Sequence, residues 1–543
     1  MAVKLDLADI QGNILTAYGK LGFPKGRFMV FHVSNPDSGR KFVTDLLPKI
    51  TTALRWPSKS TYIPTGKVAV TRPEITVNIA FTWYGLLALG IPIRTLRGMP
   101  DEFIDGMAAR APMLGDDFAG SMPWDEVWSK SARGGIGPNE NRVHILVMLN
   151  AQMTPLTGGA VPALNTMTRD IETLAQKNGG VTLLTGHNQP GQEMRRYQEL
   201  TAILTRKDGQ YEPTPKEHFG FTDALGDPVF EGQYPDEHEQ TVATGNGALD
   251  GHGNWRPLAT GEFLLGYPDE AQEAACATMP LDFSRNGTFM AYRKLHQNVA
   301  AFRNFIQETA RDYAKVCGIQ NLEDARELLM AKMAGRWSDG IPLALAPTVE
   351  AWHEFQDKLR QMTDEKAREL ALMDFTFRGD KEGIKCPVTS HVRRVNTRDS
   401  MDPTGEDGSI LNNRRRILRR GLPYDDSAHV APGSEERGIV MLVICASLVR
   451  QFEFVQQQWI NYGLDAGAGS DTCPLTGNHS DGTAGGKNGP KAKFVIPSDP
   501  ESGKPPFIVE GIPQFVETRG GEYFFVPSMT ALRMIGMGVV DPT

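Results

Sequence analysis

Short runs of apolar residues, some of them alternating with polar ones, recur along the first half of the chain and predict β-strands. Three such runs lie at 27–32, 76–81 and 142–149, and runs of this length and pattern are typical of strands in a half-buried sheet. Residues 42–54 and 167–177 instead carry apolar side chains every three or four positions, the spacing of a helix with one buried face. The order strand, helix, strand, and then strand, helix, strand is typical of a ferredoxin-like unit.

The same pattern of strands and helices returns in the second half of the chain, with longer insertions between the elements. Strands are predicted at 287–293, 438–445 and 520–526, and helices at 295–315 and 448–462. The repetition indicates two related units, each combining a sheet with helices.

A loop-rich stretch separates these two halves. Residues 231–280 contain clusters of Gly, Asp, Pro and other polar residues, which favour turns. A chain of 543 residues also exceeds the usual size of a single core. We therefore expect an N-terminal domain over 1–230, connecting loops over 231–280 and a C-terminal domain over 281–543. Residues 94–140, rich in Gly, Pro and Met, are expected to run over the surface as a long excursion.

Composition and charge exclude several classes of partner. The chain has 40% hydrophobic and 22% charged residues and a net charge of -8, which argues against binding to nucleic acid or to an anionic membrane surface. No apolar run reaches about 18 residues, so no membrane span is expected. The oligomeric state is left open by the sequence.

Cysteine usage and the start of the chain bear on location. Five scattered cysteines show neither zinc-binding spacing nor a Cys-x-x-Cys-His motif, and a disulfide framework is not expected. The first residues, MAVKLDLADIQGN, lack the apolar core of a signal peptide. A cytoplasmic location is therefore expected, with secretion as the alternative if a leader was removed.

One segment, CPVTSHVRRVNTR at 386–398, combines a single histidine with a basic run. A neutral imidazole such as His391 can bind haem iron, and Arg393, Arg394 and Arg398 could then hold the haem propionates. The alternative is an ordinary histidine at a helix start beside arginines on a solvated face.

Further segments combine with this one into a pattern. In chain order they are DIQGNIL at 9–15, GFTDALGDP at 220–228, NGTFMAYRKLHQNVAAF at 286–302, CPVTSHVRRVNTR at 386–398, RILRRGLPY at 416–424 and GGEYFFVPS at 520–528. With these segments the chain resembles the dye-decolorizing peroxidases. The long form, with its large insertions, resembles the subgroup that includes fungal enzymes and their bacterial relatives. The resemblance implies an α+β fold of two ferredoxin-like domains, with antiparallel sheets, peripheral helices and the haem in the second domain.

The resemblance also implies a function. A protein of this family is expected to bind one b-type haem (heme b) per chain, reduce hydrogen peroxide, and oxidise dyes, phenolics or other aromatic small molecules through a ferryl intermediate. His391 would bind the iron, Asp223 would be the distal acid–base, and Arg419 would stabilise the charge on the departing oxygen. The alternative is a haem-binding or haem-iron-handling protein with little peroxidase turnover. Because a carrier needs only the iron ligand, the presence of Asp223 and Arg419 favours peroxide chemistry.

Four other residues are carried over as contacts of the haem or of its ligand. Arg398 is expected to pair with a propionate, and Ile439 and Met441 are expected to lie over the haem. Asp465 is expected to accept the hydrogen bond from the second ring nitrogen of His391, which would make the imidazole more basic. The alternative for Asp465 is a turn residue.

The last expectations concern a departure from the family motif and a route for electrons. The distal motif usually reads Gly-x-x-Asp-Gly, and Ala224 replaces its second glycine here. Since glycine adopts positive φ freely and alanine does not, the loop is expected to shift. Tyr424 and Trp459 occupy positions where surface aromatic residues pass electrons in some relatives, although such residues more often serve packing.

Overall fold

The computed structural model describes residues 3–540 except 20–21, 57, 60–68, 117–123, 134–136, 251, 276–277, 402–409, 426–435 and 480–491. Its centre is an antiparallel sheet in which the strands follow the order β13-β14-β12-β17-β4-β5-β1-β6, with β7 also paired to β1. The strands of this sheet are β1 Lys25–Val33, β4 Ile75–Phe81, β5 Ile145–Ala151, β6 Val181–Leu183, β7 Gln198–Thr201, β12 Thr288–Gln297, β13 Leu418–Asp425, β14 Arg437–Cys445 and β17 Val516–Val526.

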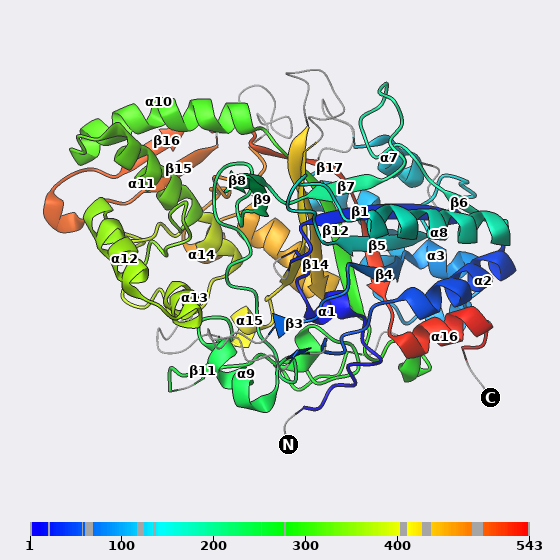
Figure 1. Cartoon of the computed structure of the whole chain (residues 1–543). Coiled ribbons are helices and arrows are strands. Elements are labelled where there is room, and N and C mark those ends of the chain that lie inside the picture. Colours follow the sequence, from blue (N-terminus) through cyan, green and yellow to red (C-terminus); the bar gives the residue numbers. More distant parts are fainter. Residues whose placement is uncertain are drawn as a thin grey trace.

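Shorter strands form two-stranded ribbons outside this sheet, and helices surround it (Figure 1). The ribbon strands are β2 Ser58–Lys59, β3 Ala69–Val70, β8 Leu204–Lys207, β9 Gln210–Pro213, β10 Ala248–Leu249, β11 Trp255–Arg256, β15 Lys493–Ile496 and β16 Phe507–Glu510. The helices are α1 Gly12–Leu15, α2 Pro36–Leu46, α3 Trp83–Ala88, α4 Ile93–Leu96, α5 Asp101–Asp105, α6 Met107–Leu114, α7 Glu126–Ala132, α8 Pro162–Asn178, α9 Asp236–Ala243, α10 Val299–Cys317, α11 Leu322–Ala334, α12 Val349–Gln361, α13 Glu365–Met373, α14 His391–Val395, α15 Ile410–Asn413 and α16 Met529–Met537. Among the described residues, no helix is both long and apolar enough to cross a membrane.

The two halves of the sheet repeat one arrangement. In the first half the chain runs β1, α2, β4, β5, α8, β6, and in space the strands lie in the order β4-β5-β1-β6. In the second half β12, β13, β14 and β17 lie in the corresponding order β13-β14-β12-β17, with α10 following β12. The halves join where β4 meets β17, at Phe81 and Phe525. The predicted α+β fold with two ferredoxin-like units is confirmed.

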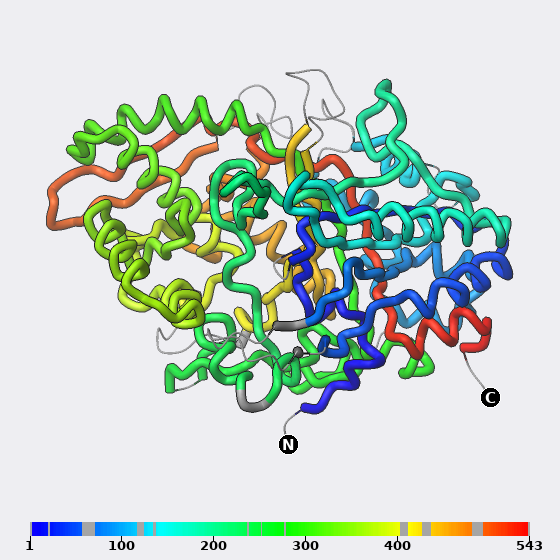
Figure 2. The backbone as a smooth tube through the Cα atoms, viewed as in Figure 1, coloured from blue at the N-terminus to red at the C-terminus, as the bar shows by residue number. Residues whose placement is uncertain are grey.

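The C-terminal end of the chain packs against the first of these units. Figure 2 shows the last helix, coloured red, beside the blue N-terminal part of the chain, away from the rest of the second half. There α16 packs against α2, and the amides of Met529 and Thr530 donate to the main-chain and side-chain oxygens of Asp9 at 2.8 and 2.7 Å. The N-terminal segment 9–15 is thus tied to the C-terminal end of the chain.

Two predicted elements differ from the structure for identifiable reasons. The helix expected at 42–54 instead begins at Pro36, because the side chain of Asn35 accepts from the Ser38 amide at 2.9 Å, and it ends before Pro48. The surface excursion expected at 94–140 contains helices α4 to α7, and it buries Trp124 and Trp128 to 1% and 2% exposure. Parts of that stretch, and the middle of the polar loop that follows His391, lie outside the described residues.

Strand β13 was not predicted, although it carries a central site residue. Its side chains alternate between buried and partly exposed, so that Leu418, Leu422 and Tyr424 enter the core while Arg419 lies on the opposite face. Successive residues of a strand point to opposite faces, which explains this division. The basic run that precedes and opens the strand hides this alternation in the sequence.

Candidate active site

A cavity of about 2060 Å³ lies against one face of β12, β13 and β14. Arg419 of β13 and Ile439 and Met441 of β14 line it from the sheet, and His391 of α14 and Asp223 line it from other elements. Pockets for drug-sized ligands usually measure about 300–1,000 Å³, so this cavity has room for a large cofactor together with a second molecule. Five of the sequence-predicted site residues therefore meet in one space.

Asp223 and Arg419 form an ion pair inside this cavity. Arg419 Nη1 donates to Asp223 Oδ1 at 2.9 Å. The loop that carries Asp223 is held at the main chain, where the Asp223 amide donates to the Pro215 carbonyl at 2.8 Å and the Thr222 amide donates to the Ser338 carbonyl at 3.0 Å. The side chains of Asp223 and Arg419 are 40% and 37% exposed, because they face the cavity.

The charges of this pair are mutually supported. Burial raises the pKa of Asp223, but the charge of Arg419, the Ala224 amide and the Arg419 hydrogen bond together outweigh it and hold the pKa below its ordinary value. The charge of Asp223 in turn raises the pKa of Arg419 against the effect of burial. The pair thus presents an ionised carboxylate and a fixed cation to whatever binds in the cavity.

Ala224 adopts a backbone conformation that glycine reaches more easily than alanine. Its φ is +60°, in the left-handed region that alanine reaches only at a cost of about 1–2 kcal/mol. The alanine is therefore strained in this loop.

His391 is the first residue of helix α14 and lines the cavity, and one of its ring nitrogens is engaged by protein. Its Nδ1 lies 3.2 Å from Cys473 Sγ and 3.3 Å from Thr476 Oγ1. Its Nε2 has no hydrogen bond to the part of the chain that the structure describes. A histidine arranged in this way can bind a metal through Nε2 while Nδ1 fixes the ring.

The acceptor beside His391 differs from the one expected. Asp465 accepts from Trp459 Nε1 at 3.1 Å and does not bond to His391. Burial raises the pKa of the Cys473 thiol, but His391, Arg394 and the Thr476 hydroxyl outweigh burial and lower it to about 6. The expectation for Asp465 is therefore wrong, because the loop that follows Trp459 places a sulfur, not a carboxylate, next to the imidazole.

Comparison with known proteins identifies relatives of this chain. A family model described as the DyP dimeric alpha+beta barrel domain matches residues 9–179. Peroxidase 2 of Mycetinis scorodonius is 26% identical over 551 residues, covering 98% of this chain and 88% of that protein. The multifunctional dye peroxidase DyP2 of an Amycolatopsis species is 30% identical over 329 residues, covering 59% of this chain and 61% of the relative.

Solved structures show the same fold over nearly the whole chain. One of them, described as a dye-decolorizing peroxidase in complex with 2,6-dimethoxyphenol, has a TM-score of 0.67 at 24% identity and covers 98% of this chain and 100% of its own. Over nearly its whole length the chain is similar to dye-decolorizing peroxidases. One solved relative is described through the engineering of its heme pocket.

A cluster of three buried arginines fits the propionates of a haem. Arg398 donates Nη1 to the carbonyls of Met373 and Phe375 at 3.0 and 2.7 Å. Its Nε and Nη2 have no hydrogen-bond partner among the described residues. Burial, with the charges of Arg336 and Arg416, lowers the pKa of Arg398 well below its ordinary value.

The other two arginines of the cluster face the cavity. Arg336 and Arg416 both line it, and burial lowers the pKa of each to about 10. Buried guanidinium groups with spare donors are stabilised by an anion that brings its own charge and acceptors. Arg398 has such spare donors but does not itself line the cavity, whereas His391, Arg336 and Arg416 do. These four residues would hold a cofactor that carries carboxylates.

The remaining arginines of the predicted haem segment have structural partners. Arg393 pairs with Asp380 at 2.9 Å, and Arg394 donates to the carbonyls of Trp459 and Asp471 at 2.8 and 2.7 Å. Both side chains are buried away from the cavity lining. The expectation that they hold propionates is wrong, because they anchor neighbouring loops to α14.

Tyr424 and Trp459 do not lie at the surface. Their exposures are 2% and 4%. Tyr424 packs on the core side of β13 with Lys294 Nζ 4.8 Å from its ring centre, and Trp459 lies in a π-helical segment, Val455–Ile460, with its Nε1 bonded to Asp465. The expectation of surface electron-transfer residues at these positions is therefore wrong, and packing accounts for both.

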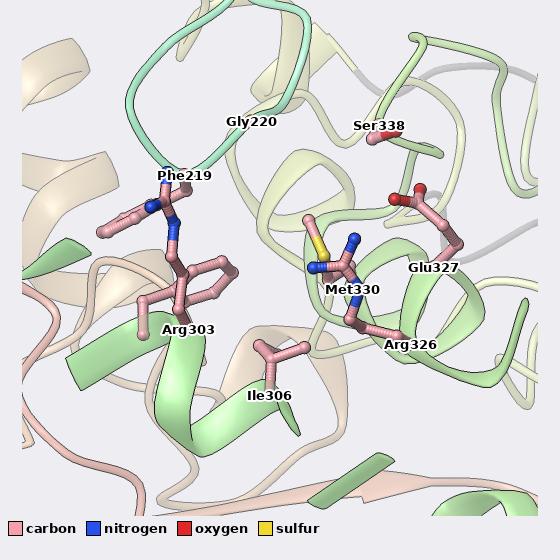
Figure 3. Close-up of a pocket in the computed structure, with 9 residues that line it drawn as sticks. Phe219, Gly220, Arg303, Ile306, Arg326, Glu327, Met330 and Ser338 are labelled. Carbon is pink, nitrogen blue, oxygen red and sulfur yellow. The ribbon is translucent and has the colours of Figure 1, made fainter. Parts of the chain in front are cut away.

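A smaller pocket lies beside Phe219 and Gly220, in the segment that leads to Asp223. Figure 3 shows this pocket, of about 400 Å³, with its lining residues, which include Phe219, Gly220, Arg303, Ile306, Arg326, Glu327, Met330 and Ser338. Phe219 lines both this pocket and the large cavity. None of the predicted site residues lines the small pocket, so the large cavity is the candidate active site.

Sequence reasoning missed Cys473 and Arg336. Cys473 begins a compact Cys-Pro-Leu-Thr-Gly turn, and Arg336 follows Gly335, the C-cap of α11. Neither position carries a motif that marks a haem contact by itself. A proline directly after a buried cysteine and a glycine four residues after it would have been the only signal for the turn.

Proposed function

We propose that this protein is a peroxidase that uses one b-type haem per chain to reduce hydrogen peroxide and oxidise dyes, phenolics or similar aromatic molecules. The observation that carries the proposal is the shared cavity, which His391 and the Asp223–Arg419 pair both line. When bound, haem supplies the iron that binds peroxide and takes up the oxidising equivalents released when the O–O bond breaks.

The distal residues move the proton and stabilise the charge that develops. The ionised Asp223 accepts the proton from the inner peroxide oxygen and returns it to the outer oxygen, which leaves as water. Arg419 donates to the departing oxygen and stabilises its negative charge. Two molecules of phenol then each give up one electron and one proton, so that one peroxide yields two waters and two phenoxyl radicals.

Aromatic reductants have a direct way into the site. The cavity that contains Asp223 also has Leu54, Lys366 and Glu369 in its lining, and these three residues are exposed at the surface. Because Tyr424 and Trp459 are buried, we propose that small reductants enter this cavity. The relative that is described in complex with 2,6-dimethoxyphenol supports a phenolic substrate.

Dye oxidation by the haem-loaded protein tests the proposal against haem handling. A peroxidase shows peroxide-dependent oxidation of a dye and of a phenol at acidic pH, and this activity falls in Asp223→Asn. Protein that is fully loaded with haem but shows no such oxidation would instead support a haem-binding protein without turnover. The Asp223–Arg419 pair favours turnover because a carrier has no need of it.

We also propose the division into domains and a location. Domains over 1–230 and 281–543, joined by the loops of 231–280, are supported by the repeated strand order of the two units. The haem would lie mainly on the second, since His391, Arg398 and the strands β12 to β14 belong to it. A cytoplasmic location is supported by the free thiols of the described cysteines.

A further inference from the structure

Cys473 occupies the place beside His391 where haem enzymes of this type need a hydrogen-bond acceptor. Its Sγ lies 3.2 Å from His391 Nδ1 and 3.4 Å from Thr476 Oγ1. The residue is fully buried and does not line the large cavity. Among the described residues no carboxylate is hydrogen-bonded to Nδ1, since Asp465 is engaged by Trp459.

The main chain around Cys473 is fixed from several directions. Its amide donates to the Ile460 carbonyl at 2.7 Å, and its carbonyl accepts from the Gly477 amide at 2.9 Å. His479 Nε2 lies 2.8 Å from the same carbonyl oxygen. The turn also requires Gly477, because a Cβ there would lie 2.6 Å from the Cys473 oxygen.

The turn is in addition tied to the helix that carries His391. Arg394, three residues after His391 in α14, donates to the carbonyls of Trp459 and Asp471 on either side of the loop. The sulfur is therefore held in place independently of its contact with the imidazole. A side chain fixed in this way can impose an orientation on its neighbour instead of following it.

We propose that Cys473 is the positioning residue for the iron ligand: its sulfur accepts the Nδ1 proton of His391, which fixes the tautomer and leaves Nε2 facing the cavity. The inference rests on the proposed haem ligation by His391. The sulfur can accept two hydrogen bonds at once, one from the imidazole of His391 and one from the hydroxyl of Thr476. In this chain a thiol group therefore performs the task that a carboxylate, a carbonyl or water commonly performs for a metal-bound histidine.

The Fe–His stretching frequency of the ferrous haem protein, measured by resonance Raman spectroscopy, tests this role. In Cys473→Ala the acceptor is lost, and the band is expected to shift to lower frequency. In Cys473→Asp a carboxylate takes over, and the band is expected to return to the wild-type frequency or above it. Cys445→Ala is the matched control, because Cys445 is another fully buried thiol, in β14, and its removal should leave the band unchanged.

The outcomes separate the possible failures. An unchanged band in Cys473→Ala would overturn the inference and leave only a packing role for the sulfur. If Cys473→Ala fails to retain haem while its circular dichroism stays native, recovery of haem binding in Cys473→Asp supports the inference, and its absence overturns it. If the wild-type protein binds haem but shows no Fe–His band, the ligation by His391, and with it the proposed function, is wrong.

Discussion

Removal of the Arg419 guanidinium should slow the reaction with peroxide and move its pH dependence. Arg419→Leu removes the guanidinium whose Nη1 lies 2.9 Å from Asp223 Oδ1. The departing oxygen then loses this cationic hydrogen-bond donor. Loss of a single donor that stabilises developing charge typically costs about 10²–10³ in rate. We expect Arg419→Leu to fall in this range and Asp223→Asn to fall by an equal or smaller factor.

The same substitution changes the protonation of Asp223. In the wild type, Arg419 and the Ala224 amide outweigh burial, so the pKa of the carboxyl lies below its ordinary value and the base form persists into acid. Without the arginine, burial is the largest remaining influence and raises the pKa. The acidic limb of the pH–rate profile for the peroxide step should therefore move to higher pH.

Stopped-flow mixing of the haem-loaded protein with peroxide, repeated across pH, measures both effects. Arg437→Leu is the matched control, because Arg437 pairs with Asp425 at 3.0 Å and is 39% exposed, close to the 37% of Arg419, but lies outside the cavity lining. The control should keep the wild-type rate and profile. A near-normal rate in Arg419→Leu beside an inactive Asp223→Asn would refute the role assigned to the arginine.

Three further outcomes follow from the site. Ala224→Gly should stabilise the protein by about 0.5–1 kcal/mol in denaturant unfolding, since it relieves left-handed strain at some cost in chain entropy, and a loss of stability would contradict the strained geometry at φ +60°. Arg398→Met should weaken haem affinity about 10- to 100-fold in a transfer assay, because each charge-assisted hydrogen bond contributes about 1.5–3 kcal/mol, and unchanged affinity would exclude a propionate contact. Dye turnover should peak below about pH 5, because an aspartate stays ionised to roughly pH 4 whereas an imidazole protonates near pH 6.5, and a peak near neutrality with a fall below pH 6 would remove Asp223 from the role of distal base.

Residues whose role follows from local sequence were predictable, and those whose role depends on loop packing were not. His391, Asp223 and Arg419 stand in motifs of their own, and the structure brings all three to one cavity. Cys473 lies beside His391 because Arg394 of α14 is hydrogen-bonded to the loop that carries the cysteine. The two carbonyls that accept from Arg394 lie 65 and 77 residues after it in the sequence. No spacing rule relates these positions in the sequence.

The error over Tyr424 has a simpler origin. Arg419 and Tyr424 lie five positions apart in β13, so they point to opposite faces of the sheet. Once Arg419 is assigned to the cavity, the strand period alone places Tyr424 in the core. The strand went unpredicted because its first residues are basic, and the alternation of Leu418, Arg420, Leu422 and Tyr424 was therefore not recognised.

The absorption spectrum of His391→Ala, compared with the wild type, tests the central claim most directly. The wild-type protein should bind one haem per chain, and His391→Ala should lose most of its Soret absorbance while its circular dichroism stays native, because haem iron needs a strong axial ligand. His353→Ala, which removes an exposed histidine, should keep the wild-type spectrum. A full Soret band with one haem per chain in His391→Ala would show that another residue binds the iron and would contradict the account.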